Sequence, residues 1–212
     1  MTVDSTAPDL RRTHTERHLE ELVAFLDRHE TILSRVGNID EDLWEDRATD
    51  LIFANGKATA TDFGRLVFNQ LVGRSAGTSE VRFRPDFLDP WLQKTSRNIA
   101  AALIAGIVAD VDEIGPDDTF SVLRSRAAEL AVTLTTISSN FGAHDGARAA
   151  GAGSKTWQVT SDNPRSSHAA LNGETVPLGQ SFSNGLRWPG DRDGGVDETA
   201  NCHCTLTFTR GR

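Results

Sequence analysis

The sequence lacks the features that mark membrane and exported proteins. No apolar run is long enough to cross a bilayer, because the most apolar stretch, residues 99–111, is too short and is followed by acidic residues. The first residues do not show the basic and then apolar pattern of a signal peptide. These absences predict a protein that is made in the cytoplasm and has no membrane partner.

The motifs of several common enzyme classes are also missing. The sequence contains no Walker A loop, no Ser-centred nucleophile elbow, no HExxH helix and no Rossmann glycine fingerprint. This argues against nucleotide-dependent enzymes, serine hydrolases and zinc proteases of those types. We therefore predict no catalytic residues and no enzyme activity.

Negative charge is abundant but unevenly distributed. The net charge is −8, while residues 155–212 contain six basic and six acidic side chains. The whole acidic excess therefore lies in residues 1–154. Because affinity for a phosphate backbone comes from lysine and arginine, this charge balance disfavours extensive direct binding to DNA.

Apolar periodicity predicts a mainly helical N-terminal two-thirds after a loose polar arm over residues 1–12. Asp40 is a candidate N-terminal cap of the second helix, and Asn55-Gly56 is expected to end that helix. Gly73 is expected to end the third helix. Residues 74–90 read as a linker or exposed loop, and Asp117 or Asp118 is expected to cap the last long helix. The expected helices cover residues 13–36, 40–54, 61–72, 91–114 and 120–149.

The pattern changes after a small-residue turn at 149–153. Residues 156–160, 174–177 and 204–208 have strand character, and residues 168–171 fit a short helix. Asn172-Gly173 is a turn signal. The predicted fold class is therefore α+β, with a compact, loop-rich α+β module behind the helices.

The two cysteines, Cys202 and Cys204, are the only ones in 212 residues. In an extended strand their side chains share a face about 7 Å apart, which disfavours a disulfide between them. Two thiolates at this spacing can bind one zinc ion, which prefers four tetrahedral ligands. His168 is the best candidate for a third ligand, and Asp191, His203 or a water for the fourth.

Other interpretations of these residues stay open. The thiols can be two small buried apolar groups in a final strand, as free cysteines often are. A nucleophilic thiol would need His168 or His203 within hydrogen-bond reach. An acid–base role for His168 would need Asp162 or Asp191 to orient it.

The remaining polar residues have simpler explanations. Asp162 and Arg165 are expected to pair across a turn and hold a loop. Four histidines are predicted at the surface or at a helix end, namely His14, His18 and His29 on the polar side of the first helix, and His144.

The order of motifs in the C-terminal third resembles the phage Mu F-like head-morphogenesis domain. The motifs are Lys155-x-Trp157, then Asp162, Arg165 and His168-x-x-Leu171-Asn172-Gly173, then Pro189-Gly190-Asp191, and finally Asn201-Cys202-His203-Cys204. Two departures from the family pattern are Asn163-Pro164, where a shorter step is common, and His203, where arginine is usual.

The resemblance implies two regions, residues 1–115 of unassigned role and residues 116–212 as the head-morphogenesis domain, made of a helix over 116–150 and the α+β module over 155–212. It further implies a minor structural protein of a tailed-phage head. Such a protein would be made in the host cytoplasm and located in the virion, in the head interior or at the portal vertex. Its partners would be the portal protein or the major capsid protein, and its role head assembly, DNA packaging or ejection.

An enzyme remains the alternative. In that hypothesis His168, Cys202 and Cys204 hold the zinc of a hydrolase or nuclease, and Asp162 or Asp191 handles protons. The metal would need an open coordination position with a bound water.

Overall fold

The computed structural model describes residues 6–73, 83 and 88–211. Four long helices come first, followed by three short strands with short helices between them. The elements are α1 (Thr6–Val36), α2 (Glu41–Val72), α3 (Leu88–Ile114), α4 (Pro116–Ala149), β1 (Ala152–Gln158), α5 (Ser166–Leu171), β2 (Thr175–Pro177), η1 (Arg192–Gly194), α6 (Gly195–Thr199) and β3 (Thr205–Arg210). The predicted α+β class is confirmed.

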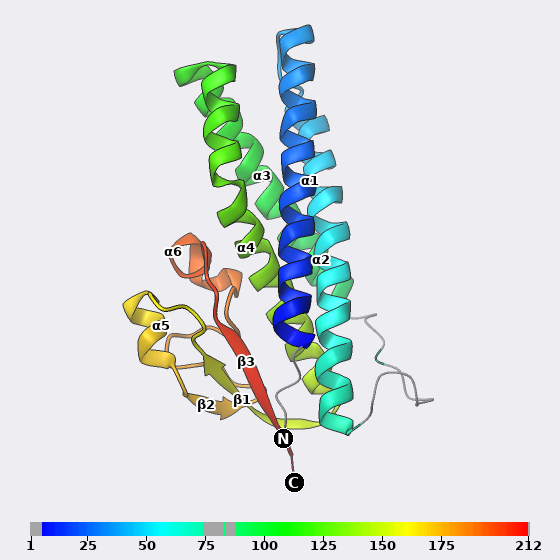
Figure 1. The fold of residues 1–212 in the computed structure, drawn as a ribbon, viewed down its shortest axis with the longest axis vertical. Helices are drawn as coiled ribbons and strands as arrows, with labels where there is room; N and C mark the ends of the chain where they lie inside the picture. Colours follow the sequence, from blue (N-terminus) through cyan, green and yellow to red (C-terminus); the bar gives the residue numbers. More distant parts are fainter. Residues whose placement is uncertain (1–5, 74–82, 84–87, 212) are drawn as a thin grey trace.

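The four long helices lie side by side along the long axis of the molecule (Figure 1). Their largest core combines side chains from all four, including Leu26, Trp44, Ile104, Phe120 and Ile137. The predicted boundary between residues 115 and 116 falls inside this bundle, and independent folding of the two regions stays a prediction.

Helix ends follow local chemistry at several of the predicted positions. Asp40 caps α2 by accepting a hydrogen bond from the Leu43 backbone N–H at 3.1 Å, as expected. Gly73 ends α2 in the left-handed conformation, with φ of 71°. At the start of α4, Gly115 is the capping residue and Pro116 is the first helical residue, so the predicted cap by Asp117 or Asp118 is wrong.

Two predicted helix boundaries are also wrong. α1 already begins at Thr6, so residues 6–12 are helical rather than a loose arm. α2 runs through Asn55-Gly56 without a break, which makes the predicted second and third helices one. A Cβ on Gly56 would lie 3.1 Å from Ser138 Oγ, so the small residue serves close helix packing rather than a turn. The predicted linker falls mostly outside the described residues, and its last three residues belong to α3.

The approach of α4 to α2 depends on glycine. A Cβ added at Gly142 would overlap the backbone of Ala60, and one added at Gly146 would overlap the backbone of Gly64. Both glycines are buried on one face of α4. Close contact between these two helix backbones fixes the part of α4 on which the C-terminal module is built.

The C-terminal module is a three-stranded antiparallel sheet in the order β2-β1-β3, packed with α5 and α6 beside the C-terminal half of α4 (Figure 1). Trp157 of β1 lies opposite Leu206 of β3. The module has its own core, which contains Trp157, Leu171, Phe182, Leu186, Trp188, Cys202, Cys204 and Leu206. The three predicted strands and the short helix before Asn172 are present, but β1 begins at Ala152, inside the predicted turn, and ends at Gln158 rather than at residue 160. η1 and α6 were not predicted.

The histidines of α1 are buried, so their predicted surface position is wrong. His14 Nε2 lies 3.1 Å from Asp62 Oδ2, and the Thr59 hydroxyl lies 3.3 Å from His18 Nε2. His29 Nδ1 donates to the Phe25 carbonyl at 2.7 Å. Polar groups on α1 and α2 thus bind these three buried histidines on a face of α1 that sequence periodicity predicts to be exposed.

Burial of His18 predicts a loss of stability in mild acid. Burial, with the nearby Arg17 and His14, lowers the pKa of His18 from 6.5 to about 3. His18 therefore takes up a proton near pH 6.5 in the unfolded chain but not in the folded chain. The free energy of unfolding consequently falls as the pH drops below about 6.5. We expect His18→Gln to reduce the loss of unfolding free energy between pH 7 and pH 5 by about 1–2 kcal/mol, measured by urea denaturation.

The matched control is His203→Gln, which changes an exposed histidine. It should leave the pH dependence as in the unaltered protein. An equal pH dependence in all three proteins would show that His18 is not the responsible group.

Candidate metal centre

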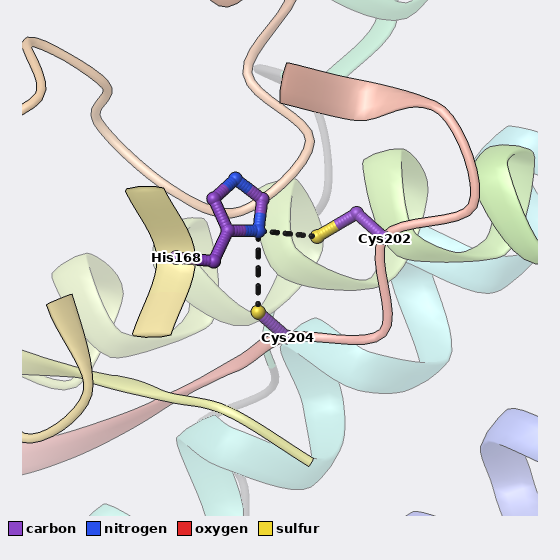
Figure 2. Close-up of side chains that lie close together, drawn as sticks. All are labelled: His168, Cys202 and Cys204. Carbon is purple, nitrogen blue, oxygen red and sulfur yellow. Dashed lines mark hydrogen bonds between the residues drawn. The ribbon is translucent and has the colours of Figure 1, made fainter. Parts of the chain in front are cut away.

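Three side chains from two separate segments converge in the core of the module. His168 lies on α5, and Cys202 and Cys204 lie in the segment between α6 and β3 (Figure 2). His168 Nδ1 is 3.6 Å from Cys202 Sγ and 3.5 Å from Cys204 Sγ. Their three potential ligand atoms lie within 4.8 Å of one another, the only such group found among the described residues.

The backbone around the cysteines is shaped by two local features. Asn201 adopts a left-handed conformation with φ of 48°, and it turns the chain immediately before Cys202. Arg165, at the start of α5, donates from Nη2 to the Ala200 carbonyl at 2.6 Å. The second contact ties the histidine-bearing helix to the segment that leads into the cysteines.

Glu198 of α6 fixes the orientation of the His168 ring. His168 Nε2 lies 2.8 Å from Glu198 Oε2, and the same carboxylate accepts a hydrogen bond from Ser167 Oγ at 3.1 Å. When Nε2–H donates to the carboxylate, Nδ1 presents a lone pair to the two sulfurs. A carboxylate behind a histidine is the common outer partner of a metal-bound imidazole.

The two thiols share their protons unequally. A hydrogen bond from Cys202 lowers the pKa of Cys204, against the opposing effect of burial. The same hydrogen bond, together with burial, raises the pKa of Cys202. Cys204 is therefore the sulfur that loses its proton more readily, and binding of a metal by both sulfurs releases the protons that remain on them.

The arrangement of the two sulfurs and the ring nitrogen suits metal binding better than nucleophilic catalysis by a cysteine. The order Cys204, His168, Glu198 has the form of a cysteine–histidine–carboxylate triad, with a thiol within reach of His168. However, Cys202 points at the same ring nitrogen, and a nucleophile needs only one sulfur. Both cysteines are also 2–3% exposed, so a substrate atom could not reach either sulfur without opening the core.

Two of the predicted candidates for a fourth ligand lie elsewhere. The Asp191 carboxylate accepts from Arg187 Nε at 2.8 Å and from the Arg187 backbone N–H at 3.0 Å. His203 is exposed, and its Nε2 lies 3.2 Å from Asn201 Oδ1. Neither belongs to the cluster, so their prediction as ligands is wrong, and a water is the candidate that remains.

The other predicted residues have structural positions. Trp157 is fully buried, and its ring packs edge-on against His168 at 5.1 Å between centroids. Gly173 has φ of 84° and donates its backbone N–H to the Trp157 carbonyl at 2.9 Å. The predicted pairing of Asp162 with Arg165 is wrong, because Asp162 is exposed and no ion pair joins the two in the described structure.

Side chains of α4 hold the backbone of the cysteine segment. The Thr136 hydroxyl donates to the Cys202 carbonyl, and Asn140 Nδ2 donates to the Cys204 carbonyl at 3.0 Å. The Asn201 backbone N–H donates to Thr133 Oγ1 at 2.8 Å. These residues and Glu198 were not predicted from the sequence, because each contacts a partner at least 30 residues away along the chain.

For a metal held by this cluster, we expect Glu198→Gln to weaken binding by about 10–100-fold. The amide keeps the size of the side chain but loses the negative charge that orients His168. Competition with a chromophoric chelator measures the affinity. Asp197→Asn is the matched control, since Asp197 is the exposed acidic neighbour on α6. Equal affinity in both variants would remove the assigned role of Glu198.

Comparison of the chain with protein-family models, with curated proteins and with solved structures gives no match. The resemblance to the phage Mu F-like domain thus stays a prediction from the sequence motifs. The chemistry of the site is argued from its own residues.

Proposed function

We propose that the chain is a structural protein of a tailed-phage head. In this proposal one zinc ion, bound by His168, Cys202 and Cys204, holds the C-terminal module together and is called the zinc staple. The observation that carries the metal assignment is the convergence of two cysteine sulfurs on one nitrogen of His168. The phage role is supported by the order of sequence motifs, which includes both cysteines and this histidine.

Zinc is the metal that suits this donor set best. Two thiolates and one imidazole are soft to borderline ligands, and zinc binds such sets with tetrahedral geometry. His168, Cys202 and Cys204 would supply three positions, and a water the fourth. Calcium and magnesium are poor candidates, because they prefer oxygen ligands.

The burial of the ligands favours a structural metal over a catalytic one. Three protein ligands and a water are also the ligand count of a catalytic zinc, but substrate must reach a catalytic metal, and all three ligands here are almost fully buried. The hydrolase or nuclease alternative also assigned proton transfer to Asp162 or Asp191. Asp162 is exposed outside the cluster, and Asp191 is engaged by Arg187.

The helical bundle is the part proposed to bind the portal protein or the major capsid protein. Its acidic excess suits basic protein surfaces and disfavours adhesion to packaged DNA. Within the described residues, no helix is long and apolar enough to cross a membrane. The proposed location is the virion, in the head interior or at the portal vertex.

The double substitution Cys202→Ser and Cys204→Ser tests the zinc staple. We expect about one zinc per chain in the unaltered protein by inductively coupled plasma mass spectrometry, and none in the double variant. The variant should melt at a lower temperature, and a chelator should lower the melting temperature of the unaltered protein only.

His203→Gln provides the control, since it changes the histidine between the two cysteines but not a proposed ligand. It should keep the metal. An unaltered protein without metal would refute the staple, and a folded double variant that loses an enzymatic activity would favour the hydrolase or nuclease instead.

The phage role predicts a stable complex with head proteins. We expect the tagged full chain to capture the portal protein or the major capsid protein when these are co-expressed from the same genome. Cross-linking followed by mass spectrometry should place the contacts on α1 to α4. Capture of neither protein, under conditions in which both are soluble, would contradict the proposed role.

A further inference from the structure

Arg11 lies on the first turns of α1, far in sequence from the proposed metal ligands. Its side chain reaches α4, where Nη1 donates to Thr136 Oγ1 and Nη2 donates to Ser139 Oγ, each at 3.1 Å. Arg11 is half-buried, and a guanidinium removed in part from water usually pairs with a carboxylate. In the described part of the chain, Arg11 has no such ion pair. Its two terminal nitrogens instead donate to two hydroxyl groups on α4.

The Thr136 hydroxyl connects Arg11 to the cysteine segment. This hydroxyl has a single proton, which it donates to the Cys202 carbonyl, and its lone pairs remain to accept from Arg11. The hydrogen bonds therefore run in one direction, from Arg11 to Thr136 to Cys202. Such a chain is cooperative, because each bond polarises the next.

The charge of Arg11 also suits its position. Burial lowers the pKa of Arg11 to about 10, and the negative charges of Cys202 and Cys204 oppose this shift. The guanidinium thus stays charged at neutral pH and lies within the field of the two sulfurs. A charged donor also makes the hydrogen bonds to Thr136 and Ser139 stronger than those of a neutral donor.

We propose that Arg11 is a positioning residue of the metal centre, which holds the Cys202 backbone in place through Thr136 and so couples docking of α1 to metal binding. The inference rests on the proposed zinc staple and deepens it, because it makes the first helix part of the site. Docking of the start of α1 should raise the affinity for metal by some factor. By thermodynamic linkage, bound metal should then raise the equilibrium constant for docking of α1 by the same factor.

The test compares Arg11→Met with the unaltered full chain. We expect zinc affinity to fall about tenfold, measured by chelator competition. We also expect an altered sulfur-to-cobalt charge-transfer band in the Co²⁺ form, because the sulfurs are less well placed. Arg12→Met is the matched control, since Arg12 is the exposed neighbour that pairs with Asp9. It should behave like the unaltered protein.

Hydrogen exchange gives a second readout that a merely structural role would not move. In the unaltered protein, zinc should slow amide exchange over residues 8–16 and leave residues 28–36 of the same helix unchanged. In Arg11→Met, zinc should no longer slow exchange over residues 8–16. Equal affinity, spectrum and exchange in the Arg11 and Arg12 variants would overturn the proposal.

If Arg11→Met does not fold, Thr136→Val tests the same proposal. This substitution keeps the shape of the side chain and removes the connecting hydroxyl, so it should reproduce the tenfold loss of affinity. Unchanged affinity in Thr136→Val would overturn the proposal. An unaltered protein that binds no zinc would overturn both this inference and the zinc staple, whereas zinc binding that is insensitive to all these changes would overturn this inference alone.

Discussion

The contact between the polar side of α4 and the cysteine segment is the interaction on which the rest of the structure depends. Thr136 and Asn140 bind the carbonyls of Cys202 and Cys204, so the bundle sets the backbone from which both sulfurs project. Because Gly142 and Gly146 bring α4 against α2, the position of this polar side is itself fixed by close helix packing. The bundle therefore positions the cysteine segment of the module that packs beside it.

This arrangement gives a physical reason for placing a metal there. The two buried thiols lie at hydrogen-bond distances from His168, and coordination to a metal is stronger than a hydrogen bond to a thiol. A metal ion would replace these contacts with stronger bonds and would join α5 to the segment before β3. Glu198 completes the set by holding His168 in the orientation that the sulfurs require.

Sequence patterns predicted the parts of the molecule that depend on near neighbours. The α+β class, the cap at Asp40, the strands of the module and the choice of His168 as partner of the cysteines all follow from local spacing or from a motif. The failures come from contacts between distant segments. Asn55-Gly56 has the pattern of a helix end, but it lies within one continuous helix and α4 packs against it. His14 and His18 fall on the polar side of α1, but Thr59 and Asp62 of α2 contact them.

Residues that act on the site through other residues were also beyond local reasoning. Glu198 and Arg11 carry ordinary charged side chains, and nothing in their immediate sequence distinguishes them from the charged residues around them. Their roles appear only when α6 and α1 are placed against His168 and α4. Long-range packing thus decides which charged groups serve the site, while the sequence motif identifies the ligands themselves.

X-ray absorption spectroscopy at the zinc edge, on protein purified without added chelator, tests the central claim most directly. The account predicts about one zinc per chain with two sulfur neighbours at about 2.3 Å and nitrogen or oxygen neighbours at about 2.0–2.1 Å. A protein without metal, or a metal shell without sulfur, would contradict it.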